Sequence, residues 1–144
     1  MLAIGCDHGG YSLKCEIMKH LAEKGIDFTD FGCGGETVDY PDIAERVCAE
    51  ISEKKAERGI LICGTGIGMS MAANKVKGIR AAVCGDCFSA RFTRLHNDAN
   101  VLCLGARVTG AGLALQIVDE FLNTGFEGGR HSARVEKVMK LEGK

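Results

Sequence analysis

Two patterns of apolar residues alternate along this chain. Short apolar runs bounded by glycine or polar residues predict strands that are covered on both faces of a sheet, because such strands have no face to expose to water. These runs lie at 2–6, 60–62, 79–84 and 101–104, and the segment 26–31, in which apolar and polar residues mix, predicts a further strand. Between them apolar residues recur at helical spacing, as Leu13, Ile17 and Leu21 do. The predicted helices span 11–24, 42–58, 69–75, 88–95, 112–122 and 130–141.

The alternation of strands and helices predicts the fold class. Parallel strands that are joined through helices form a sheet with helices on both faces and right-handed crossovers. We therefore expect an α/β fold, a Rossmann-like three-layer α/β/α sandwich with a five-stranded parallel sheet. At 144 residues, with no repeat and no linker, the chain is expected to form a single domain over residues 1–144.

Composition and charge exclude several classes of function. The net charge of −1 argues against general binding to nucleic acid or to a membrane surface, and no apolar run approaches the ~20 residues of a membrane-spanning helix. The chain starts directly with a predicted strand, so no signal peptide is expected. Most of the eight cysteines lie in apolar runs or helical segments, which is typical of reduced thiols in a cytoplasmic protein.

The most informative segment is 59–75, where a predicted strand runs into a loop with glycine at every second position. Cys63 ends the strand, and Gly64, Gly66 and Gly68 follow it. The N–H groups of such a loop and of the start of the next helix lack partners and can bind negative charge. A cysteine beside them is either a base or nucleophile, which acts as the thiolate, or a core residue, since free cysteines are often buried.

Two other patterns compete for the same region. The dinucleotide-binding pattern G-x-G-x-x-G is not matched, because Met69 or Met71 stands in the place of its third glycine. Asp86 nevertheless lies 20 residues after Gly66, where an acidic residue could bind a ribose hydroxyl, so a nucleotide-binding module remains an alternative. The lone C-x-x-C at 84–87 could be redox-active or structural. No second pair completes a zinc site, so we expect no metal.

A carboxylate and an imidazole follow the first predicted strand. Asp7 and His8 are expected at the same end of the sheet as Cys63, because the carboxyl ends of parallel strands meet there. They could bind sugar hydroxyls or transfer protons. The alternative is that both are structural loop residues.

Arginines of the C-terminal part could bind a phosphate group. Arg130 and Arg134 are four residues apart and share one face of the last predicted helix. With a third arginine such as Arg107 they could clamp an anion, since guanidinium groups bind phosphate bidentately. Alternatively, they are surface residues paired with Glu127 or Glu136.

Taken together, these motifs resemble those of the B-type ribose-5-phosphate isomerases and of the allose-6-phosphate and galactose-6-phosphate isomerases. The matching motifs span nearly the whole chain and lie at 5–9, 39–41, 62–68, 72–75, 78–81, 96–98, 105–107 and 127–131, with Arg134. The resemblance implies an aldose–ketose isomerase that needs no cofactor. It also implies a homodimer or a pair of dimers with active sites shared between subunits, in which the helix from about 130 completes the site.

The resemblance implies a role for each site residue. Cys63 would be the base that moves a proton between C1 and C2, His96 the acid that opens the sugar ring, and Thr65 would assist at the ring oxygen. The substrate-binding positions would be Asp7, His8, Gly64, Gly66, Ile67, Gly68, Asn97, Arg107, Arg130, His131 and Arg134. The expected reaction interconverts ribose 5-phosphate and ribulose 5-phosphate through an enediolate. The alternative is a hexose 6-phosphate substrate, with pocket depth set by 32–40 and 86–91.

Overall fold

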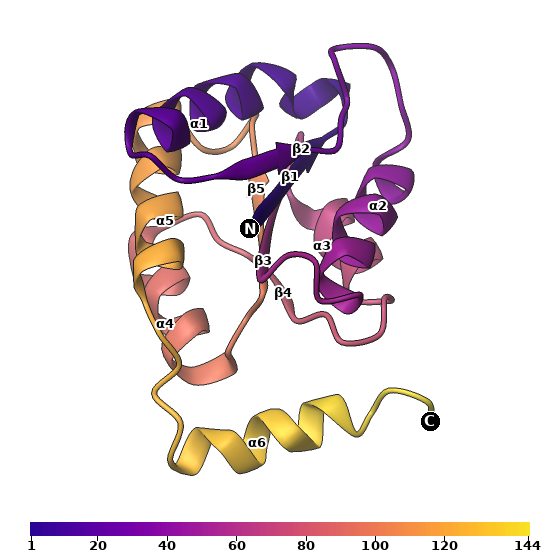
Figure 1. Cartoon of the computed structure of the whole chain (residues 1–144), viewed down its shortest axis with the longest axis vertical. Helices are drawn as coiled ribbons and strands as arrows, with labels where there is room; N and C mark the ends of the chain where they lie inside the picture. The colour runs from indigo at the N-terminus through magenta and orange to yellow at the C-terminus, as the bar shows by residue number, and fades with distance from the viewer.

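The computed structural model describes residues 1–144 and confirms the predicted three-layer sandwich (Figure 1). Its sheet has five strands in the order β2-β1-β3-β5-β4, and every neighbouring pair is parallel. The strands are β1 (Leu2–Cys6), β2 (Phe28–Asp30), β3 (Arg58–Cys63), β4 (Ala81–Val83) and β5 (Val101–Gly105). Because β3 is the central strand, the residues that follow it lie in the middle of the sheet's carboxyl-terminal end.

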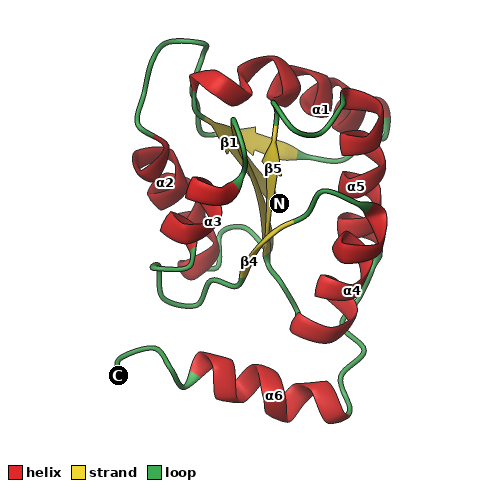
Figure 2. Ribbon diagram, turned by 180° about the vertical axis from the view of Figure 1, so that it is seen from behind, coloured by secondary structure: helices red, strands yellow, loops and turns green.

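Helices cover both faces of this sheet. They are η1 (His8–Gly10, a 3-10 helix), α1 (Tyr11–Glu23), α2 (Tyr40–Ser52), α3 (Ile67–Ala73), α4 (Cys87–Asn97), α5 (Ala111–Asn123) and α6 (Arg130–Met139). Figures 1 and 2 show α1, α4 and α5 on one side of the sheet and α2 and α3 on the other. None of the helices is both long enough and apolar enough to cross a membrane.

The central strand explains why the apolar runs are continuous. Ile60 and Ile62 belong to the apolar cluster on the side of α1 and α5, whereas Leu61 and Cys63 belong to the cluster on the side of α2 and α3. Successive side chains of a strand point to opposite faces, so a strand that is covered on both sides is apolar at every position.

Helix α6 lies apart from the sandwich. It passes across the amino-terminal end of the sheet, beyond β4, and contacts α4 (Figure 2). His131 is the only residue of α6 that is buried. The helix is therefore held by one end of α4 and by a contact between Met139 Sδ and Arg80 Nη1 at 3.4 Å.

Several predicted boundaries were wrong. The helix predicted over 42–58 ends at Ser52, because the amides of Lys55 and Ala56 both bond to the carbonyl of Glu50 and reverse the chain before β3. The helix predicted over 69–75 starts two residues earlier, at Ile67. The two edge strands, β2 and β4, are shorter than the segments 26–31 and 79–84. The other helices differ from the prediction by at most two residues at either end.

Candidate active site

Cys63 is the last residue of β3, and its sulfur lies against the loop that leads to α3. Cys63 is 5% exposed, and its Sγ accepts a hydrogen bond from the amide of Gly66 at 3.1 Å. The loop after β5 lies directly against this loop, because the amide of Ala106 donates to the carbonyl of Cys63 and the amide of Arg107 to that of Gly64, both at 2.9 Å. Backbone hydrogen bonds between the ends of β3 and β5 thus fix the position of the thiol.

Close backbone contact explains two of the glycines. Gly66 has φ +78°, and a Cβ on it would lie 2.9 Å from the carbonyl carbon of Leu104. A Cβ on Gly105 would lie 2.5 Å from the carbonyl oxygen of Thr65. The loop therefore packs on the end of β5 at a distance that only glycine permits.

Asp7 and His8 lie beside this loop, as predicted. The amide of Asp7 donates to the carbonyl of Ile62 at 3.1 Å, so the turn after β1 is bonded to β3. The Asp7 carboxylate is buried and accepts from the amide of Gly9 at 2.9 Å. His8 is exposed, and its Nδ1 lies 3.4 Å from the amide of Val38 in the segment that leads to α2.

The remaining predicted residues at this end of the sheet border the same loop. The Thr65 hydroxyl accepts from the amide of Ile67 at 3.2 Å, at the start of α3. Gly68 leaves room for the ring of Tyr40, which would lie 2.7 Å from a Cβ at that position. The exposed side chain of Arg107 passes 3.3 Å from the Cβ position of Gly64. We call this set, Asp7, His8, 63–68 and Arg107, the thiol half-site.

The other predicted residues lie at the opposite end of the sheet. Helix α4 runs back along the sheet, so its last turn, with His96 and Asn97, reaches the amino-terminal end, where β5 begins at Val101. Helix α6 brings Arg130, His131 and Arg134 to the same end (Figure 1). We call these five residues the histidine half-site.

The three arginines of the expected anion clamp do not lie together within one chain. Arg107 follows the carboxyl-terminal end of β5, whereas Arg130 and Arg134 lie on α6 at the other end of the sheet. Their expected partners are also absent, because none of the ion pairs involves Arg107, Arg130 or Arg134. All three guanidinium groups are exposed and available to an anion.

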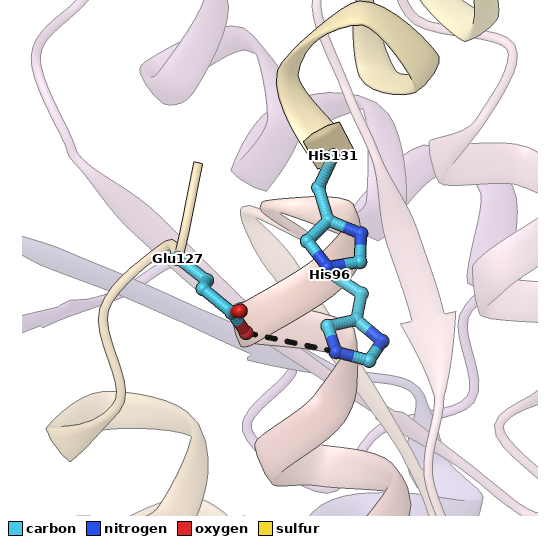
Figure 3. Close-up of side chains that lie close together, drawn as sticks. All are labelled: His96, Glu127 and His131. Atoms are coloured by element: carbon cyan, nitrogen blue, oxygen red, sulfur yellow. Dashed lines mark ion pairs between the residues drawn. The ribbon is translucent and has the colours of Figure 1, made fainter. Parts of the chain in front are cut away.

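His96 lies between a carboxylate and two rings (Figure 3). Its Nε2 is 3.7 Å from the nearer carboxylate oxygen of Glu127. Its ring stacks on that of His131, with centroids 4.1 Å apart and an angle of 13° between the planes, and the ring of Phe92 meets it edge-on at 5.0 Å. The sequence did not reveal the contact with Glu127, because it depends on how the segment before α6 folds back onto α4.

Burial and charge together keep His131 neutral. The residue is 4% exposed, and its Nε2 has no hydrogen-bond partner. Burial lowers the pKa of His131, and the positive charges of His96, Arg130 and Arg134 lower it further against the opposing charge of Glu127. His131 therefore supports His96 as an uncharged ring.

A cavity of about 970 Å³ separates α6 from the body of the protein. The histidine half-site lines it with His96, Asn97, His131 and Arg134, and Lys75 and Arg80 add positive charge. The imidazole of His96 and several positively charged side chains therefore face the same cavity.

The residues behind the nucleotide and redox alternatives have structural roles. The Asp86 carboxylate caps α4 by accepting from the amide of Ser89 at 2.6 Å and from its hydroxyl at 2.9 Å. Burial, with a smaller effect from the charge of Asp86, raises the pKa of the Cys84 thiol to about 11, which disfavours the reactive thiolate. Cys87 points toward Gln116, with its sulfur 3.9 Å from the amide oxygen.

Comparison with known proteins identifies the family of this chain. The chain matches the Ribose/Galactose Isomerase family over residues 2–138 and belongs to that family.

Individual relatives match over nearly the full length. The chain is 49% identical to ribose-5-phosphate isomerase B of Escherichia coli over 142 residues, which are 98% of this chain and 95% of the relative. It superposes on ribose-5-phosphate isomerase B of Clostridium thermocellum with a TM-score of 0.96 and 54% identity, covering 98% and 96% of the two chains. The chain superposes on ribose-5-phosphate isomerase B of Mycoplasma genitalium, solved with bound ribulose-5-phosphate, with a TM-score of 0.93 and 42% identity. The superposition covers 98% of this chain and 95% of the other.

The close packing of the glycine loop predicts opposite effects for two glycine substitutions. Gly105→Ala is expected to destabilise the protein by about 1 to 3 kcal/mol, because the new methyl group meets the rigid backbone of Thr65. Gly112→Ala is the matched control. Nothing lies within 4 Å of its Cβ position in α5, so alanine is expected to stabilise by up to about 1 kcal/mol. Urea unfolding at one protein concentration measures both, and equal effects would contradict the packing argument.

Proposed function

We propose that this protein interconverts ribose 5-phosphate and ribulose 5-phosphate, with Cys63 as the base. The observation that carries the proposal is the hydrogen bond from the Gly66 amide to Cys63 Sγ in the glycine loop. An N–H donated to sulfur stabilises negative charge on it, and the thiolate is the form that takes up a proton. The names of the relatives support the pentose phosphate substrate.

The reaction needs only proton transfer and charge stabilisation. The Cys63 thiolate removes the proton from C2 of the open-chain aldose, and the electron pair moves toward O1 to give the enediolate. A proton then passes from O2 to O1, and C1 takes up the proton held by the Cys63 thiol as the carbonyl forms at C2. Amides of the loop 64–68 would stabilise the enediolate, where each lost donor costs about 3 to 4 kcal/mol in comparable oxyanion sites. The substrate is neither oxidised nor reduced overall, so no redox cofactor is required.

His96 is the acid that opens the furanose ring before this step. His96 lines the cavity at this end of the sheet, with its Nε2 3.7 Å from the Glu127 carboxylate, and its imidazole can donate a proton to the ring oxygen there. Thr65, beside the thiol, would assist at the same oxygen. Asp7, His8 and Asn97 would hold the sugar hydroxyls.

The active site is shared between two subunits of a homodimer. Cys63 and His96 lie at opposite ends of the sheet of one chain, so neither half-site alone contains both the base and the acid. In a two-fold symmetric dimer the thiol half-site of each chain can face the histidine half-site of the other. Large apolar side chains flank both half-sites and are exposed in the single chain: Ile67 and Met71 on α3, Phe88 on α4, and Val138 on α6.

The arginines would bind the phosphate. Arg130 and Arg134 are exposed, share one side of α6 and have no carboxylate partner. Their charges hold the remote end of the sugar, and this fixes the reacting carbons against the thiolate. Arg107, which lies beside the thiol in its own chain, would contact the other end of the substrate.

A hexose 6-phosphate is the second candidate substrate, because the family is named for both ribose and galactose. The segment 32–40, which carries Val38 against His8, borders the thiol half-site and would set the length of the pocket. Turnover of ribose 5-phosphate, allose 6-phosphate and galactose 6-phosphate by protein treated with chelator separates these candidates.

The eight free thiols fit a reducing compartment such as the cytoplasm.

The shared site predicts that two inactive variants rescue each other. Cys63→Ala and His96→Ala should each lower kcat by at least about 100-fold, as expected for the loss of a general base or acid. A mixed dimer has one site with both residues intact and one site with neither. After unfolding and refolding an equal mixture, about a quarter of wild-type activity should return, because half of the dimers are mixed and each has one active site.

Mixing Cys63→Ala with Cys63→Ser is the control and should restore nothing. No recovery from the first mixture, although mixed dimers are seen by native mass spectrometry, would show that the base and the acid come from the same chain. Full activity of either single variant would remove that residue from the mechanism.

Removing the two α6 arginines should weaken substrate binding. The double variant Arg130→Ala, Arg134→Ala is expected to raise KM for ribose 5-phosphate by about 10- to 100-fold, since each charge-assisted hydrogen bond contributes about 1.5 to 3 kcal/mol and these groups are exposed. Lys137→Ala, an exposed basic residue of the same helix, is the control. Equal KM values for the double variant and the control would place the phosphate elsewhere.

A further inference from the structure

Three potential metal ligands meet at the junction of α4 and α6. His96, Glu127 and His131 each offer one ligand atom, and these atoms lie within 4.8 Å of one another (Figure 3). Backbone hydrogen bonds hold them together. The amide of Glu127 donates to the carbonyl of Leu95 at 3.0 Å, and the amide of His131 donates to the carbonyl of Gly128 at 3.1 Å.

A second observation points to a ligand at this cluster. The Nε2 of His131 is buried and has no hydrogen-bond partner, which is unusual for a buried polar atom. Figure 3 shows the His131 ring lying over His96, with the Glu127 carboxylate beside them. Metals bind histidine through an imidazole nitrogen that carries no proton, so the unpartnered Nε2 of His131 is a potential ligand atom.

We propose that His96, Glu127 and His131 bind a divalent transition-metal ion of the zinc type, and that this ion inhibits the enzyme. The inhibitory part rests on the proposed function, because the ion would occupy the nitrogen of His96 that protonates the ring oxygen. Two imidazoles and one carboxylate are a recurring zinc ligand set that leaves a fourth position open. Imidazole nitrogens also favour zinc over magnesium, which prefers oxygen ligands.

The cluster must contract to hold the ion. Zinc lies about 2.0 to 2.2 Å from nitrogen and oxygen ligands, so neighbouring donors of a tetrahedral site are about 3.3 Å apart. The widest pair, at up to 4.8 Å, must therefore close by about 1.5 Å. His131 is fixed by burial, but the side chains of His96 and Glu127 are 36% and 55% exposed and can move. The ring of His96 turns out of the stack, which uncovers His131 Nε2.

Cobalt and zinc binding to metal-free protein test the site directly. Titration with Co²⁺ should give the visible absorption of a low-symmetry site at one ion per chain, without the near-ultraviolet bands of thiolate ligation. Isothermal titration with Zn²⁺ should show that Glu127→Gln weakens zinc binding by at least about tenfold. Even the loss of a residue that only hydrogen-bonds to a metal ligand lowers metal affinity by about this factor. Glu136→Gln, an exposed glutamate of α6 outside the cluster, should bind zinc like the wild type.

Inhibition is measured separately with ribose 5-phosphate. Zn²⁺ should inhibit the wild type and Glu136→Gln at the concentration that fills the site, chelator should restore activity, and Glu127→Gln should need about tenfold more zinc. Equal zinc affinity in all three proteins, or thiolate bands with cobalt, would overturn the site. Zinc binding at the cluster by a protein with no isomerase activity would refute the proposed function and leave the metal site standing.

Discussion

The structure depends on the contact between the glycine loop and the end of β5. The backbone of Thr65 and Gly66 lies so close to Leu104 and Gly105 that no side chain fits between them. This contact turns the amide of Gly66 onto the sulfur of Cys63. The position of the thiol is therefore set by main-chain packing in the rigid centre of the sheet, which is how a proton-transfer group is held in one geometry.

The parallel topology imposes a second constraint. Each helix that follows a strand returns the chain from the carboxyl-terminal to the amino-terminal end of the sheet, so residues at the end of such a helix lie far from residues at the end of a strand. Cys63 ends β3 and His96 lies in the last turn of α4. A site that needs both requires a second chain, and the exposed arginines of α6 and the apolar residues around it fit that requirement.

Much of this could be predicted from local sequence. The continuous apolar runs revealed the parallel strands because both faces of the sheet are covered, and the position of Cys63 at a strand end placed Asp7 and His8 beside it. The end of α2 was missed because Glu53 to Glu57 are compatible with a helix and only the tertiary path requires a turn there. The stack of His96 on His131 and the approach of Glu127 could not be predicted, since they arise when α6 docks on α4.

The most direct test of the central claim is a crystal structure of the protein with bound ribulose 5-phosphate. The account predicts C1 and C2 at about 3 to 3.5 Å from the sulfur of Cys63, the separation of reacting atoms in a near-attack geometry. It also predicts that the phosphate contacts Arg130 and Arg134 of the partner subunit. A sugar bound with its phosphate on the arginines of the same chain that supplies Cys63, or with both carbons remote from the sulfur, would contradict it.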